Sequence, residues 1–197
     1  MRIAKAKLVS TAPMSQSRYH GARMGDKEKP DAYSERTWKF QMHTENDGLD
    51  DNGDAYQGKN VMIPGHALKK CIAEGAKYLS IKIEGGGGQA KYSKNFLAGI
   101  MIVESFPIGI KTADVKVPER HFMSPNGKGG RVWRLFPTFK EWSANVEVLI
   151  LDDAIPNDVF DWVIKQSGLL IGLGRWRAIN GGNYGRFEVE NLTIEEM

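Results

Sequence analysis

The sequence predicts a mixed α+β protein, and three observations support this prediction. Segments 66–79 and 156–170 space their apolar residues as amphipathic helices do. Segments 2–10 and 144–151 alternate apolar with polar residues, which is typical of strands. The 197 residues are 41% hydrophobic and 26% charged, which suits a single domain, 1–197, with its own core.

The first half of the chain predicts one strand and one helix around a polar insertion. In segment 2–10, Ala4, Ala6 and Leu8 share one face, so this segment is expected to be the opening strand. Residues 11–60 form the polar insertion, in which Trp38–Met42 is an expected short strand. Pro64 and Gly65 then give the start signal of a helix. Its apolar stripe consists of Leu68, Cys71, Ile72, Ala76 and Leu79.

The second half predicts a similar alternation. The expected elements are a central strand at Phe96–Val103, a thumb-like inserted loop or hairpin at 108–131, a strand at Arg131–Phe136, a strand at Ala144–Leu151, a helix beginning at Pro156 and a last strand at Phe187–Ile194. The core elements then follow the order βαββαβ, which is the ferredoxin-like or RRM-like arrangement. Two helices would cover one face of the sheet and leave the other face free for a ligand or a neighbouring subunit.

Composition limits the function classes. The net charge of +3 and the pI of about 8.9 are compatible with a nucleic-acid partner only if the charge is clustered. Cys71 is the single cysteine, so an internal disulfide and a Cys-rich zinc site are excluded, and its place in an apolar stripe predicts a buried, inert thiol. No apolar stretch reaches the length of a membrane span, and no signal peptide is visible. We expect a location in the cytoplasm of a bacterial or phage-infected cell.

The glycine-rich loop, residues 168–187, is the most informative segment. It contains six glycines, whose backbone can approach a ligand closely. Among them lie Arg175, Trp176, Arg177, Tyr184 and Arg186, side chains that bind phosphates and stack on bases. These residues favour contact with nucleic acid over a tight structural connection, which is the alternative. A dinucleotide fingerprint is excluded because a helix precedes the glycines and a strand follows them.

Other polar segments supply further candidate contacts to nucleic acid. These are Ser15, Arg18, His20 and Arg23 after the first strand, His66 and Lys69 at the first helix, Lys91, Tyr92 and Lys94 after the four consecutive glycines 85–88, and Arg131 and Arg134. The acidic residues Asp47, Asp50, Asp51 and Asp54 lack the register of a calcium loop. We therefore predict no metal site, no cofactor and no catalytic constellation.

Three motifs in order resemble the RAMP superfamily of CRISPR-associated proteins, especially the backbone subunits that line guide RNA. They are Ala12-Pro-Met-Ser-Gln-Ser-Arg18 after the opening strand, Ile63-Pro-Gly-His-Ala-Leu-Lys69 at a helix start, and the glycine-rich loop. The resemblance implies an RRM-like core, an inserted thumb, and oligomers along a single strand. At the helix start, where the family has serine, this chain has His66, so the resemblance does not imply a contact between a hydroxyl and a phosphate there. The segment around 175–187 also looks like proteins encoded by bacteriophages and prophages.

The favoured hypothesis is a non-enzymatic protein that binds single-stranded RNA or DNA and oligomerises along it. Two alternatives stay open. One is an endoribonuclease that uses His20 or His121 as general acid–base. The other is a protein–protein module, such as a phage inhibitor of CRISPR-type complexes or a structural subunit. The sequence does not choose between RNA and DNA.

Overall fold

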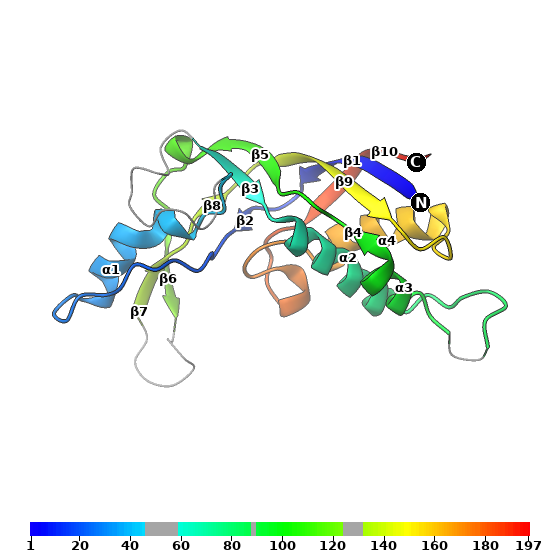
Figure 1. Cartoon of the computed structure of the whole chain (residues 1–197). Coiled ribbons are helices and arrows are strands. Elements are labelled where there is room, and N and C mark those ends of the chain that lie inside the picture. Colours follow the sequence, from blue (N-terminus) through cyan, green and yellow to red (C-terminus); the bar gives the residue numbers. More distant parts are fainter. Residues whose placement is uncertain (46–58, 88–89, 124–131) are drawn as a thin grey trace.

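The computed structural model describes residues 1–45, 59–87, 90–123 and 132–197 and has a mixed α+β architecture with several antiparallel sheets, as expected (Figure 1). The largest sheet contains β1 (Arg2–Ser10), β4 (Ile100–Met101), β9 (Ser143–Ile150) and β10 (Phe187–Glu196), in the order β10-β1-β9-β4. All three pairings in this sheet are antiparallel.

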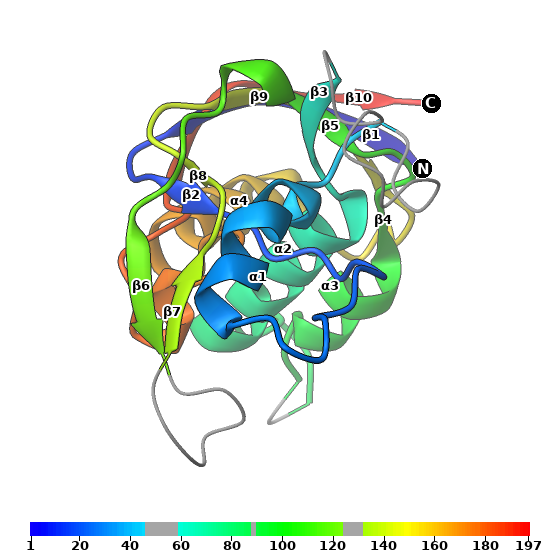
Figure 2. The same ribbon diagram turned by 90° about the vertical axis from the view of Figure 1, so that its left-hand side faces the viewer.

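Two long helices pack beneath one face of this sheet (Figures 1 and 2). They are α2 (Gly65–Leu79) and α4 (Asn157–Leu170). The core joins Leu8 of β1 and Val146 of β9 to Ile72 of α2 and Phe160 of α4, all of which are at most 1% exposed. The opposite face of the sheet carries polar residues, because side chains alternate across a strand.

A second group of elements lies beside the large sheet, on the left of Figure 1. Three small antiparallel sheets join β2 (Met14–Ser15) to β8 (Thr138–Phe139), β3 (Asn60–Ile63) to β5 (Phe106–Lys111), and β6 (Arg120–Met123) to β7 (Val132–Leu135). Helix α1 (Pro30–Thr37) packs against β7 and continues into the 3-10 turn η1 (Trp38–Gln41). Two further short 3-10 turns are η3 (Thr112–Asp114) and η5 (Ala178–Asn180). We call α1, η1, β6 and β7 the side lobe.

Most of the expected elements are confirmed. β1 has its predicted bounds, and Ala4, Ala6 and Leu8 point into the core. α2 begins one residue after Pro64, which occupies the N-cap position, and buries the predicted apolar stripe apart from partly exposed Leu79. The predicted segments near β7, β9, α4 and β10 all lie within three residues of the observed bounds.

Two strand predictions are wrong. Trp38–Met42 is not a strand but the turn η1, which buries Trp38 while the preceding α1 begins at Pro30. The first half of Phe96–Val103 is helical: α3 (Ser93–Gly99) ends at Gly99, and only Ile100 and Met101 pair with β9. A short apolar run is compatible with either a helix or a strand, because its periodicity does not distinguish the two.

The inserted loop or hairpin predicted at 108–131 contains strands where it is described. It overlaps β5, which pairs with β3, and it includes β6, which forms a hairpin ladder with β7. The polar insertion at 11–60 likewise contains β2, α1 and η1. The acidic residues at 47–54 and Arg131 lie outside the described residues.

Candidate nucleic-acid interface

Three segments that are distant in sequence meet around one groove. The groove has a volume of about 640 Å³ and is lined by the segment after β1, the start of α2 and the glycine-rich loop. Gln16 and Ser17 come from the first segment, His66 from the second, and Arg175 and Arg177 from the third. We call it the loop groove. Two of the three motifs that carry the family resemblance thus border the same groove as the glycine-rich loop.

Backbone hydrogen bonds hold the glycine-rich loop against the segment after β1. The Arg175 N–H donates to the Ser15 carbonyl at 2.7 Å, and the Gly185 N–H donates to the Pro13 carbonyl at 2.7 Å. Within the loop, the Leu173 N–H donates to the Gly185 carbonyl at 2.9 Å. Gly185 has a φ of +76°, which favours glycine, and it leaves no room for a Cβ atom. The loop is therefore a fixed wall of the groove.

Arg177 and Arg186 bind other parts of the chain through ion pairs and hydrogen bonds. Arg177 forms a two-pronged ion pair with Glu74 of α2, with nitrogen–oxygen distances of 2.7 and 3.3 Å. Arg186 donates from Nε to the Leu169 carbonyl at 3.1 Å and from Nη1 to the Asn183 carbonyl at 3.3 Å. These contacts fasten the loop to α2 and to the end of α4. The connector interpretation of the loop therefore accounts for part of its arginine content.

Arg175 lies between aromatic rings while bordering the loop groove. Its Cζ atom is 3.3 Å from the centre of the Phe136 ring and 4.4 Å from that of Trp176. Burial lowers the pKa of Arg175 to about 10, so the guanidinium remains charged at neutral pH. Trp176 contacts Phe136 and Tyr184 edge to face, with ring centres 5.9 and 5.8 Å apart. These aromatic side chains therefore pack against one another.

A second groove, of about 820 Å³, runs along α2. We call it the lysine groove. Its charged lining consists of Lys69, Lys70, Lys77, Lys91 and Lys94, with Glu74 as the single acidic residue in this lining, and His66 also lines it. His66 and Lys70 line both grooves, so the two are adjacent. The lysines come from one face of α2 and from the segment that leads into α3.

Lys70 and Lys77 are functional candidates that the sequence reasoning missed. They share the face of α2 with His66 and Glu74, at helical spacings of four, four and three residues. This face lies opposite the apolar stripe, so helical periodicity could have identified it once Lys91 and Lys94 were known to pack nearby. The position of Lys91 and Lys94 beside this face is a tertiary contact, which helical periodicity does not predict.

Several predicted site residues lie elsewhere. Arg18, His20, Arg23 and Arg134 belong to the side lobe or to the segment packed on it, where His20 and Arg134 lie near the Tyr33 ring. Tyr92 is 8% exposed and belongs to the hydrophobic core, so its ring is not available for base stacking. Ser15 is fully buried, so its hydroxyl is out of reach of a phosphate.

The described residues contain neither a metal site nor a membrane-spanning helix. Among them, no group of three or more His, Cys, Asp or Glu side chains could hold a metal ion. The acidic residues near Asp50 and the side chain of His121, an alternative catalyst, lie outside what the structure describes. Within the same described ranges, no helix reaches the length and apolar character that a membrane span requires.

Cys71 is buried, as predicted, and we expect it to be chemically inert. Its side chain is fully enclosed between α2 and α4, and this burial raises the pKa of the thiol to about 12. Only about one molecule in ten thousand would carry the reactive thiolate at pH 8. An aromatic disulfide reagent should therefore label the folded chain at less than a tenth of the rate seen in 8 M urea. Equal rates in both conditions would contradict the burial.

No family model matches this chain, and no curated protein matches its sequence. The two adjacent grooves and their charges are the features of the chain that bear on its function.

Proposed function

We propose that this chain is a non-enzymatic binding protein for single-stranded RNA or DNA, and that the strand lies along the lysine groove and the loop groove. One observation carries the proposal. The lysine groove contains five lysines and one glutamate, a formal charge of +4, whereas the whole chain carries only +3. The positive charge is therefore clustered on one face, as binding to a phosphate backbone requires.

The pairing of Glu74 strengthens this argument. Its carboxylate is bound by Arg177, 2.7 Å away, so it does not neutralise a groove lysine by a direct ion pair. The lysines at positions 70, 77, 91 and 94 are exposed, and no ion pair involving them occurs among the described residues. Exposed lysines bind phosphates through charge and release the counterions that surround them.

The dimensions of the grooves favour a single strand. α2 has 15 residues and is about 22 Å long, which suits a site near the lower end of the ~4–16 nucleotides that single-strand binding folds cover. At one end of this track Trp176 lines the loop groove beside charged Arg175. An unpaired base can contact the Trp176 ring, whereas bases in a duplex are stacked on each other.

We also propose that the large sheet with α2 and α4 is a ferredoxin-like core of the RAMP type. In chain order these elements are β1, α2, β4, β9, α4 and β10, and β9 lies between β1 and β4 as in a split βαβ unit. The side lobe then takes the place of an inserted thumb. Further copies would bind side by side along the same strand, and binding to long strands would be cooperative.

The direct test is fluorescence anisotropy of labelled single-stranded RNA, single-stranded DNA and duplex, titrated with the full chain at several salt concentrations. We expect tight binding to one single strand, with a log–log salt slope of about −3.5 if five phosphates are neutralised. The labelled strand should stay intact over hours. Absence of binding to all three polymers would overturn the proposal, and cleavage would favour the endoribonuclease alternative instead.

A further inference from the structure

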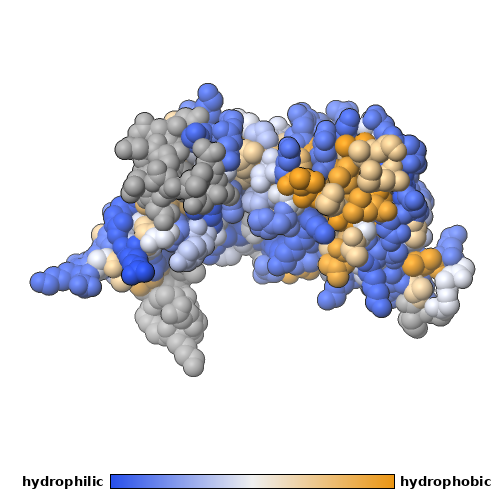
Figure 3. All heavy atoms as spheres, viewed as in Figure 1, coloured by the Kyte–Doolittle hydropathy of each residue, from blue (hydrophilic) through white to orange (hydrophobic). Residues whose placement is uncertain are grey.

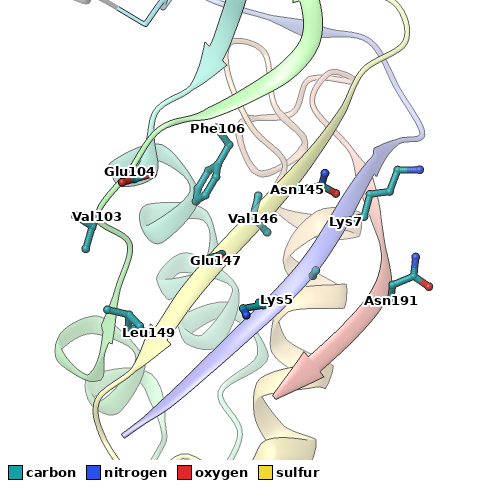
Figure 4. Close-up of a pocket in the computed structure, with 11 residues that line it drawn as sticks. Lys5, Lys7, Val103, Glu104, Phe106, Asn145, Val146, Glu147, Leu149 and Asn191 are labelled. Carbon is teal, nitrogen blue, oxygen red and sulfur yellow. The ribbon is translucent and has the colours of Figure 1, made fainter. Parts of the chain in front are cut away.

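The large sheet is split along one side of β9. β4 pairs with β9 only at Ile150 and Leu149, and then the chain turns away through Val103 and Glu104 toward β5. A pocket of about 760 Å³ covers the split between β9 and this turning segment and extends over β1 to Asn191 of β10 (Figure 4). Its volume lies within the range of ligand pockets, about 300–1,000 Å³. It is lined by the face of the sheet opposite α2 and α4, away from the two basic grooves.

The backbone of β9 directs hydrogen-bonding groups into this split. The Leu151 N–H donates to the Gly99 carbonyl at 2.8 Å, which places residue 151 on the outer side of β9. Backbone hydrogen-bonding groups alternate in direction along a strand. The N–H and C=O groups of residues 145 and 147 therefore point outward as well, whereas those of Val146 and Val148 point toward β1. In the part of the chain that the structure describes, no strand pairs with the outer side of Asn145 and Glu147.

The charges around the split are unequal. Lys5 and Lys7 form ion pairs with Glu195 and Glu190 of β10, at 3.8 and 3.6 Å. Glu104 and Glu147, by contrast, line the pocket without an ion pair among the described residues. The charge left unpaired in the split is therefore negative, and it favours a cationic partner.

Apolar side chains complete the lining. Val103 is 72% exposed, and Leu149 and Phe106 lie beside it at the pocket (Figure 4). In Figure 3, hydrophobic residues gather at the edge of the sheet near β4 and the end of β9. Met101 of β4 and Leu151, which follows β9, are exposed. Contiguous exposed apolar residues are typical of protein interaction sites.

We propose that the split binds an extended peptide of a partner protein, which adds as a strand to the outer side of β9 and carries lysine or arginine next to an apolar residue. Backbone pairing with residues 145 and 147 gives affinity, as in other cases of strand addition. The basic side chain faces Glu104 and Glu147, and the apolar one contacts Val103. This site is independent of the nucleic-acid grooves, so either proposal can fail alone.

Amide hydrogen exchange of the full-length, dilute protein tests the site. In the free chain we expect fast exchange at Asn145 and Glu147 and slow exchange at Val146 and Val148. The probe is a synthetic heptapeptide of alternating lysine and valine with blocked ends. At ten times its dissociation constant it should slow exchange at residues 145 and 147 by about tenfold. Slow exchange there in the free protein, or no change with peptide, would overturn the proposal.

Three controls sharpen the result. The same peptide with glutamate for lysine, and one with N-methylated backbone amides, should not slow exchange at 145 and 147. The variant Glu147→Lys should bind the basic probe at least tenfold more weakly, while slow exchange at Val146 reports that its sheet is intact. Protection that rises with protein concentration alone would identify a second copy as the occupant, and protection by an oligonucleotide would identify nucleic acid. Either result would overturn the peptide assignment.

Discussion

Replacing Lys70, Lys77 and Lys94 together by alanine is expected to weaken binding of single-stranded nucleic acid by about 100-fold at 0.1 M salt. Each lysine lines the lysine groove and is exposed. Each phosphate contact contributes about 0.7 to the log–log salt slope for a single strand, which is about fivefold in affinity between 1 M and 0.1 M salt. The slope should therefore become less steep by about 2. Anisotropy titrations at several salt concentrations measure both quantities.

A matched variant separates the groove from net charge. Lys5, Lys7 and Lys165 lie outside both basic grooves and form ion pairs with Glu195, Glu190 and Asp161. Their triple replacement by alanine removes the same charge and should change affinity less than threefold, because none of these lysines lines a basic groove. Similar losses in both triple variants would mean that the protein binds by overall charge, and the lysine groove would lose its role.

The substitution Gly185→Ala is expected to destabilise the fold by about 3 kcal/mol or more. Gly185 has a φ of +76°, and a Cβ atom would lie 1.9 Å from the Leu173 carbonyl oxygen. The left-handed backbone costs a non-glycine residue about 1–2 kcal/mol, and forced repacking of a tight site adds about 1–3 kcal/mol. Urea unfolding followed by circular dichroism measures the change in the free energy of unfolding.

Gly181→Ala is the control for backbone conformation. Gly181 belongs to the same loop and has a φ of +77°, but a Cβ atom there meets nothing within 4 Å. Its replacement should cost only the conformational part, about 1–2 kcal/mol. If both variants lose equal stability, the close packing of Gly185 against Leu173 contributes nothing. If neither loses stability, the loop is not a fixed wall of the groove.

Local patterns in the sequence predict the framework of the large sheet. The alternation of Ala4, Ala6 and Leu8 with lysines identifies β1, because one face of that strand is buried. The stripe from Leu68 to Ala76 identifies α2 for the same reason. By contrast, α1 is polar at most positions and has no clear apolar stripe, so nothing in its periodicity indicates a helix. Its packing against β7 depends on contacts across about a hundred residues.

The candidate site is harder to predict from the sequence than the sheet is. The glycines and arginines predict that the loop at 168–187 belongs to the candidate site, but they do not predict that Arg177 pairs with Glu74, which is 103 positions away in the chain. The same holds for Tyr92, whose burial follows from packing in the core rather than from its neighbours in sequence. Residue types indicate which chemistry is available, whereas only tertiary contacts determine which charges stay unpaired.

The central position of β1 has a consequence for folding during synthesis. β1 pairs with β9 and β10, which begin at Ser143 and Phe187. At about 5–20 residues per second, the ribosome needs roughly 7–27 s after Ser10 to reach the first of these partners. Throughout that interval the nascent β1 exposes two unpaired strand edges and its apolar face. We therefore expect newly made chains to depend on chaperones, and their yield to fall when elongation is slowed before residue 143.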